Sequence, residues 1–275
     1  MKLHFYGVRA SLSSPRPETS GIGGNTPCIA LHDEADRLLI LEAGNGLYRL
    51  GRELLESSPL GAGHGHGALL LSGTTWDRIQ GFPFFAPVFI PGNEISIYSA
   101  CDSERALELI LEGQMQPEYS PLASLDNLGA RLTFETVCDA PTVVLGFSVS
   151  ALTLPHPDKG QSTVYRIEER DRSVAYSVDL DSGTQSLEDA EAFCQGADVL
   201  IHAAYHLGAK PPGARNHQAS LLDALALARA ANIPRLVTTY YHPDHDDAMI
   251  EEAIAAASSS AIDITIGREG LTLDL

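Results

Sequence analysis

The sequence is poor in cysteine and in basic residues, and each shortage excludes a class of protein. Its four cysteines, Cys28, Cys101, Cys138 and Cys194, lie far apart and form no CxxC pair. We therefore expect buried thiols that pack as small apolar side chains, and neither a disulfide framework nor a zinc knuckle. Lys and Arg number 18 against 36 Asp and Glu, which gives a formal net charge of −18. This charge repels polyanions, so we expect no nucleic-acid partner, although a local basic pocket would still accept a small phosphate.

Long hydrophobic runs are also missing. No apolar run reaches the roughly 18 residues that a membrane-spanning helix needs, and residues Met1 to Gly7 show no basic patch followed by an apolar stretch. We therefore expect no membrane segment, no signal peptide and a cytoplasmic location. The 275 residues are 44% hydrophobic, with no low-complexity linker and no short-period repeat. This composition predicts one globular domain over residues 1–275, built of two similar halves.

Strand-like and helix-like segments alternate in both halves of the chain. Runs rich in Leu, Ile, Val and aromatic residues predict strands, and apolar residues at helical spacing predict helices. The predicted strands include Lys2–Arg9, Pro27–Leu31, Arg37–Leu41, Ala68–Ser72, Glu94–Ala100, Arg131–Val137, Thr142–Leu154, Thr163–Glu168, Ser173–Val178, Val199–Ala203 and Leu236–Tyr241. The predicted helices are Leu47–Ser57, Ser103–Gln114, Leu187–Gln195, Gln218–Ala230 and Ala248–Ser258. Such a mixture favours an α+β sandwich of two sheets with helices outside.

The segment Leu71–Phe85, which reads LSGTTWDRIQGFPFF, follows a predicted strand and is the most informative part of the sequence. Three further fragments accompany it in order: FYGVRAS from Phe5, GGNTPC from Gly23 and LILEAGNG from Leu39. Together they resemble the metallo-β-lactamase superfamily, in particular its ribonuclease Z and cyclic-nucleotide phosphodiesterase branch. The resemblance covers nearly the whole chain and implies the αββα sandwich of that superfamily.

The resemblance implies two metal ions held by loops at one edge of the sandwich, but most ligand positions are replaced. The family loop reads His-x-His-x-Asp-His, and its three histidine positions here hold Gly73, Thr75 and Arg78. The last metal-binding histidine of the family falls on Tyr240. Glycine has no donor atom, threonine is a poor zinc ligand and arginine is a permanent cation. We therefore expect no metal cofactor.

Some positions match the family. The loop aspartate is Asp77, the bridging carboxylate is Asp179, and a fourth ligand position is His156; a catalytic histidine that is not a ligand falls on His217. By this resemblance each metal would keep two protein ligands, below the three that catalytic zinc normally has. We expect these residues to remain in the cleft as a relic, with His156 and His217 pointing toward Asp179. His242 lies in an acidic run that precedes a predicted helix. It would become a substitute ligand only if the register of its strand shifted, and helix capping is the simpler role for this run.

Three functions follow from these observations and stay open at this point. The first is a pseudoenzyme whose cleft binds a small anionic ligand or that acts as a regulatory partner. The second is a phosphodiesterase-type hydrolase with one zinc, manganese or iron ion on Asp77, His156, Asp179 and His242, which would activate a bound water. The third is a structural subunit of a homodimer.

Arg78 is the replacement with the most direct structural consequence. Without metal ions, Asp77 and Asp179 would lie close together in a partly enclosed cleft, and their charges would repel. The planar guanidinium group can bind a carboxylate through two hydrogen bonds. We therefore predict that Arg78 points into the cleft and forms a salt bridge with Asp77 or Asp179, as a substitute for the missing cation.

Overall fold

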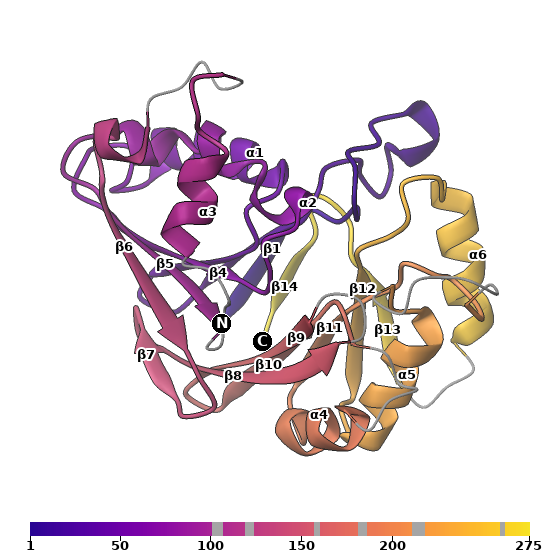
Figure 1. Cartoon of the computed structure of the whole chain (residues 1–275). Coiled ribbons are helices and arrows are strands. Elements are labelled where there is room, and N and C mark those ends of the chain that lie inside the picture. The colour runs from indigo at the N-terminus through magenta and orange to yellow at the C-terminus, as the bar shows by residue number, and fades with distance from the viewer. Residues whose placement is uncertain (101–106, 119–123, 157–159, 181–185, 211–217, 259–261) are drawn as a thin grey trace.

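The computed structural model contains two seven-stranded sheets that pack face to face, with helices on the outer face of each (Figure 1). It describes residues 1–100, 107–118, 124–156, 160–180, 186–210, 218–258 and 262–275. The predicted α+β sandwich is therefore confirmed. Within the described ranges, no helix combines the length and apolar character needed to cross a membrane.

The first sheet has the strand order β14-β1-β2-β3-β4-β5-β6. Its strands are β1 (Lys2–Gly7), β2 (Cys28–His32), β3 (Leu38–Leu41), β4 (His66–Leu71), β5 (Glu94–Ala100), β6 (Arg131–Val137) and β14 (Thr272–Asp274). The three pairings from β14 to β3 are antiparallel, and the three from β3 to β6 are parallel. The helices of this half are α1 (Gly46–Ser57), α2 (Trp76–Ile79) and α3 (Leu107–Gly113), with short 3-10 turns at Pro17–Thr19, Phe82–Phe84, Ala86–Phe89 and Leu125–Asn127.

The second sheet repeats this pattern. Its order is β13-β12-β11-β10-β9-β8-β7, formed by β7 (Thr142–Val144), β8 (Phe147–His156), β9 (Gly160–Glu169), β10 (Arg172–Ser177), β11 (Val199–Ala203), β12 (Arg235–Thr239) and β13 (Asp263–Ile266). From β7 to β10 the pairings are antiparallel, and from β10 to β13 they are parallel. Helices α4 (Ser186–Cys194), α5 (Leu221–Ala230) and α6 (Asp247–Ala257) cover its outer face. The two halves are thus similar, as the sequence predicts.

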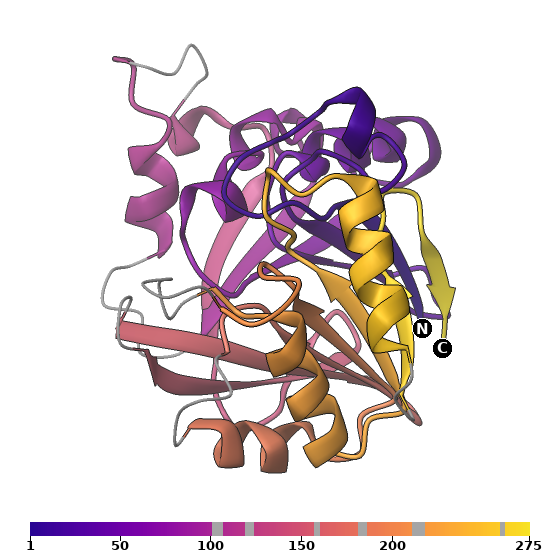
Figure 2. The same ribbon diagram turned by 90° about the vertical axis from the view of Figure 1, so that its right-hand side faces the viewer.

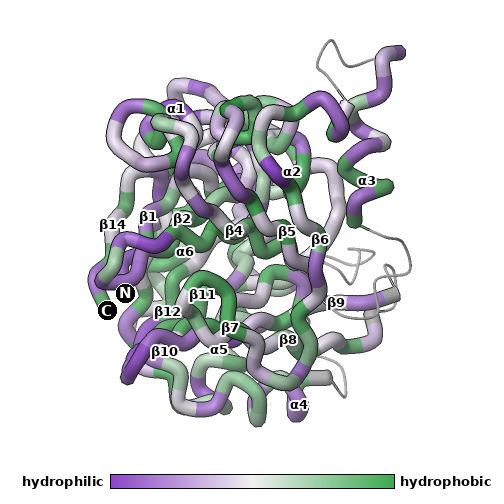
Figure 3. Tube along the Cα trace, turned by 90° about the vertical axis from the view of Figure 1, so that its left-hand side faces the viewer, coloured by the Kyte–Doolittle hydropathy of each residue, from purple (hydrophilic) through white to green (hydrophobic). Residues whose placement is uncertain are grey.

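The chain ends return to the same place. β14 pairs with β1, with Lys2 opposite Asp274, so the last strand joins the first sheet and both termini lie together (Figure 2). The central strands of both sheets are rich in apolar residues (Figure 3). One buried apolar cluster extends from the space between the sheets to the contacts of α4, α5 and α6 with the second sheet, and another packs the first sheet against α1 and the aromatic turns that follow α2. This double core fixes the strand ends from which the functional loops emerge.

Two predicted elements have other boundaries in the structure. The segment Thr142–Leu154 is not one strand but a hairpin of β7 and β8, because Leu145 and Gly146 turn the chain with φ of 46° and 90°. The helix predicted from Gln218 begins at Leu221, because Ser220 caps it by accepting a hydrogen bond from the amide of Asp223. Gln218 is thereby left outside the helix. Of the helix predicted over Ser103–Gln114, residues 103–106 lie outside the described part of the chain.

The cysteines follow the prediction only in part. Cys28 and Cys194 are buried free thiols, as expected. Cys138 is disulfide-bonded, so the expectation of a thiol is wrong there. Cys138 follows Val137, which pairs with Ala100 across β5 and β6, so distance along the sequence says little about distance in space. Cys101 lies outside the described residues.

Candidate functional site

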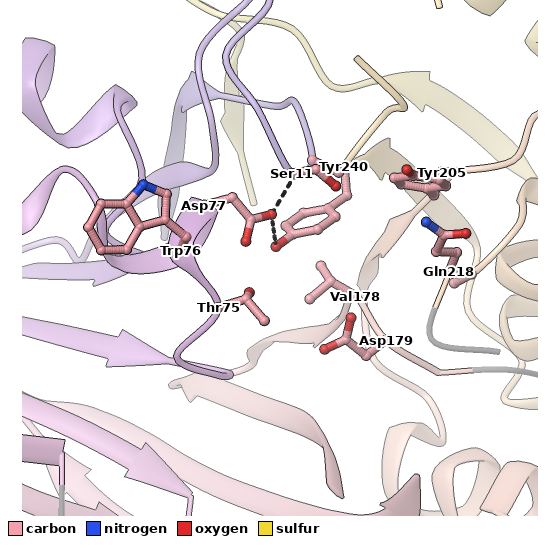
Figure 4. Close-up of a pocket in the computed structure, with 11 residues that line it drawn as sticks. Ser11, Thr75, Trp76, Asp77, Val178, Asp179, Tyr205, Gln218 and Tyr240 are labelled. Atoms are coloured by element: carbon pink, nitrogen blue, oxygen red, sulfur yellow. Dashed lines mark hydrogen bonds between the residues drawn. The ribbon is translucent and has the colours of Figure 1, made fainter. Parts of the chain in front are cut away.

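A cavity of about 240 Å³ opens where the parallel strands of both sheets end. It is formed by loops that follow β1, β4, β10, β11 and β12 and by the residues that precede α5 (Figure 4). Carboxyl ends of parallel strands are where α/β proteins commonly bind ligands, because the loops there converge. The described lining residues are Ala10, Ser11, Thr75, Trp76, Asp77, Val178, Asp179, Tyr205, Gln218, Ala219 and Tyr240. Asp77, Asp179 and Tyr240, far apart in the sequence, therefore lie around one cavity.

Asp77 is held in the cavity wall by two hydrogen bonds. It lies in α2, directly after the loop that leaves β4, and its side chain is 5% exposed. Its Oδ2 accepts hydrogen bonds from the Ser11 amide at 2.7 Å and from the Tyr240 hydroxyl at 2.8 Å (Figure 4). Tyr240 follows β12 with a φ of 60°. The hydrogen bond between the Tyr240 hydroxyl and Asp77 therefore connects the end of β12, in the second sheet, to α2, which follows β4 of the first sheet.

Arg78 connects this group to the second carboxylate. Its side chain is 1% exposed, and its Nη2 lies 2.6 Å from Oδ1 of Asp179. The other two nitrogens are engaged as well: Nε donates to the Tyr240 hydroxyl at 2.5 Å and Nη1 to the Ser72 hydroxyl at 2.9 Å. The predicted salt bridge with a carboxylate is confirmed, with Asp179 as the partner. Arg78 and Tyr240 together bridge the two acids.

Gly73 is part of the same arrangement. A β-carbon built at this position would lie 2.9 Å from Nη1 of Arg78, closer than such atoms normally approach. Arg78 cannot easily withdraw, since all three of its nitrogens are hydrogen-bonded. The glycine therefore makes room for the guanidinium group, so the residues at positions 73 and 78 depend on each other.

Glu42 interacts electrostatically with Arg78 and is a site residue that the sequence does not single out. It follows β3, is completely buried and has a φ of 62°. Its carboxyl group accepts hydrogen bonds from the hydroxyls of Ser72 and Tyr176, the latter at 3.0 Å. Burial raises the pKa of Glu42 to about 7, although Arg78 and the hydroxyls act in the opposite direction. Its only signal in the sequence is an acid at the end of an apolar strand.

The residues described here do not fit the dinuclear metal site that the fold commonly carries. Arg78 holds Asp179, and a permanent cation at 2.6 Å from a carboxylate opposes a metal ion on the same group. Gly73, Thr75 and Tyr240 supply no imidazole. Across the described ranges, no group of three or more His, Cys, Asp or Glu residues is arranged to hold a metal ion.

The histidines named from the sequence fall in three places. His156 ends β8, but its side chain lies outside the described part, as does all of His217, so their orientation toward Asp179 stays a prediction. The ring of His242 packs edge-on against Tyr205, at 4.7 Å between centroids, and its Nδ1 accepts a hydrogen bond from the Asp244 amide. The strand is not slipped, because the hydroxyl of Tyr240 reaches the site. His242 therefore does not replace Tyr240.

The acidic run that contains His242 caps a helix, as its sequence suggested. Asp246 is the N-cap of α6 and accepts a hydrogen bond from the Met249 amide. The next residue, Asp247, accepts one from the amide of Gly21. These bonds tie α6 to the loop that follows β1, so the run serves the structure of the loops around the cavity.

No protein-family model and no curated protein matches this sequence. Solved structures do. YhfI from Bacillus subtilis, a metallo-β-lactamase fold protein, superposes with a TM-score of 0.71 at 16% identity and covers 99% of this chain and 98% of its own. A diphosphatase from the PhnP family gives 0.70 at 16% identity, with 100% and 97% covered. The short form of human tRNase Z gives 0.68 at 16%, with 100% and 99% covered. The chain therefore has the metallo-β-lactamase fold.

Proposed function

We propose that this protein is a pseudoenzyme of the metallo-β-lactamase fold, which works without a metal ion and binds a small ligand in the cavity beside Arg78. The observation that carries the proposal is the buried ion pair between Arg78 and Asp179, at 2.6 Å. A family ligand position is here occupied by a cation that is part of the protein itself. The carboxylates that would attract a metal are already neutralised in part and hydrogen-bonded.

The chemistry of the cavity wall supports binding over hydrolysis. Hydrolysis requires an activated nucleophile, which a bound metal or an adjacent general base normally provides. The described lining residues offer the hydroxyls of Ser11, Thr75 and the two tyrosines, but no imidazole and no thiol. Tyr240 is an unsuitable base, because burial raises the pKa of its hydroxyl far above the ordinary value.

A mononuclear hydrolase, the alternative that the sequence left open, finds no support in the described residues. It would need Asp179 released from Arg78 and His242 turned toward the cavity, whereas the ring of His242 packs against Tyr205. A homodimer and a protein partner both remain predictions. Light scattering coupled to size-exclusion chromatography tests the first of them.

The proposal is tested by the metal content of the protein purified without a chelator. Zinc, manganese and iron are measured by mass spectrometry, before and after incubation with each metal and desalting. Hydrolysis of a generic phosphodiester, bis(4-nitrophenyl) phosphate, is assayed in parallel. We expect no stoichiometric metal and hydrolysis at the level of the buffer. Stoichiometric metal that is lost in Asp179→Asn but kept in Asp126→Asn, a change at an exposed acid, would refute the proposal.

A further inference from the structure

We infer that the cavity takes a small organic cation, in which a primary ammonium, amidinium or guanidinium group that donates hydrogen bonds is attached to a compact apolar body. The inference rests on the proposed metal-free function and assigns a charge to its ligand. This charge is the opposite of the small anion expected from the sequence.

The first observation is an unused acceptor in the cavity wall. Asp77 is 5% exposed, and both of its hydrogen bonds, from Ser11 and Tyr240, go to Oδ2. Its Oδ1 accepts no hydrogen bond from any residue in the described part of the chain. The carboxylate points into the cavity, between Thr75 and Tyr240 (Figure 4). Because this oxygen faces the cavity and is not enclosed by the protein, a ligand that carries N–H groups can donate hydrogen bonds to it.

The second observation is the sign of the charge around the cavity. Asp77 and Asp179 line it, and no Lys, Arg or His is among the described lining residues. The nearby cation, Arg78, is 1% exposed and is not among the described lining residues, so burial shields it from a ligand. Among the described residues of the site, one guanidinium group lies beside two carboxylates, so their summed formal charge is negative. The protein as a whole, at −18, also attracts cations and repels anions.

The third observation is the character of the remaining wall. Trp76 and Tyr205 lie at opposite sides of the cavity, and Ala10, Val178 and Ala219 supply apolar surface between the polar groups (Figure 4). The Trp76 side chain is 59% exposed, so its indole remains accessible. Aromatic rings attract cations through their faces. The cavity volume of about 240 Å³ equals that of roughly eight water molecules, enough for one ring with a charged substituent.

The experiment compares three probes of the same shape that differ in charge: benzamidine, benzamide and benzoate. Their affinities are measured by isothermal titration calorimetry at low ionic strength and neutral pH, with inorganic phosphate as a further anion. We expect benzamidine to bind at least about tenfold more tightly than the other probes, as one charge-assisted hydrogen bond would produce. Asp77→Asn, which keeps the acceptor for Ser11 and Tyr240, should abolish this preference. Asp126→Asn, a change at an exposed acid, should preserve it.

Thermal unfolding of both variants confirms that they are folded before the affinities are compared. Equal affinity for the three probes, a preference for benzoate or phosphate, or no binding of benzamidine overturns the inference. So does benzamidine binding that Asp77→Asn leaves unchanged. These outcomes leave the metal-free proposal intact, whereas stoichiometric metal in the purified protein would refute that proposal without any reference to the probes.

Discussion

Replacing Arg78 by methionine should lower the free energy of unfolding by about 3–5 kcal/mol, the usual cost of removing one partner from a buried ion pair. Methionine retains most of the apolar stem, so the change removes mainly the charge and the hydrogen bonds. The structure gives three reasons for a large effect. The side chain is 1% exposed, its Nη2 lies 2.6 Å from Asp179, and its other nitrogens bind the hydroxyls of Tyr240 and Ser72. The variant leaves Asp179 buried without its cation.

The measurement is urea-induced unfolding followed by circular dichroism at neutral pH, with reversibility and a single transition checked first. Arg131→Met is the matched control. The Arg131 side chain is 70% exposed, and its Nε lies 3.5 Å from Glu94. A surface pair of this kind contributes less than about 1 kcal/mol, so the control should unfold nearly as the parent does. The comparison separates loss of a buried cation from loss of any arginine.

A double-mutant cycle provides the decisive result. In the Arg78→Met background, Asp179→Asn removes a buried carboxylate charge that has lost its arginine partner. Asp179→Asn should therefore lower the free energy of unfolding less in that background than in the parent, by a difference of at least about 1 kcal/mol. The reasoning would be refuted by an Arg78→Met variant that loses less than about 1 kcal/mol. Strictly additive effects of the two changes would refute it as well.

Three further predictions concern the neighbours of Arg78. Gly73→Ala should lower the free energy of unfolding of the parent by about 1–3 kcal/mol, because the added methyl group crowds Arg78. In the Arg78→Met variant the same change should have little effect, and unfolding curves of the two pairs test this difference. Because the pKa of Glu42 rises from 4.5 to about 7 on folding, its protonation stabilises the protein fully below pH 4.5, and this contribution is lost as the pH rises through 7. The free energy of unfolding of the parent, measured from pH 4.5 to 8, should therefore fall by about 3 kcal/mol. The Glu42→Gln variant should not show this decline. Histidine introduced together at Gly73, Thr75, Arg78 and Tyr240 should restore zinc binding; a folded variant that takes up no zinc would show that the groups around the ligands have also diverged.

The fold could be predicted because its signals are local. Alternating apolar segments and their lengths indicate strands and helices, and both halves show the same order of elements. The hairpin of β7 and β8 was missed because Thr142–Leu154 is rich in apolar and β-branched residues on both sides of the turn, and only Gly146 marks the turn. The late start of α5 was missed because Gln218 and Ala219 suit a helix, whereas the cap at Ser220 decides where it begins.

The candidate site could be predicted only where a motif aligns its residues. Asp77, Arg78, Asp179 and Tyr240 follow strands at spacings that the family resemblance fixes, and the structure brings them together. Glu42 could not be predicted as a site residue. Its role arises where the ends of β3, β4 and β10 meet, so that Ser72 and Tyr176 both donate to it. Such a contact depends on the packing of the two sheets, which no local pattern encodes.

The residues around the two carboxylates form one connected unit, and this bears on what the cavity can bind. Asp77 and Asp179 buried beside each other without compensation would cost several kcal/mol. Gly73 makes room for Arg78, Arg78 binds Asp179, and the hydroxyl of Tyr240 accepts from Arg78 while it donates to Asp77. One oxygen of Asp77 is nevertheless left facing the cavity. Because that oxygen is accessible from the cavity, a ligand with an N–H group can donate to it without disturbing the hydrogen bonds that join Arg78, Asp179 and Tyr240.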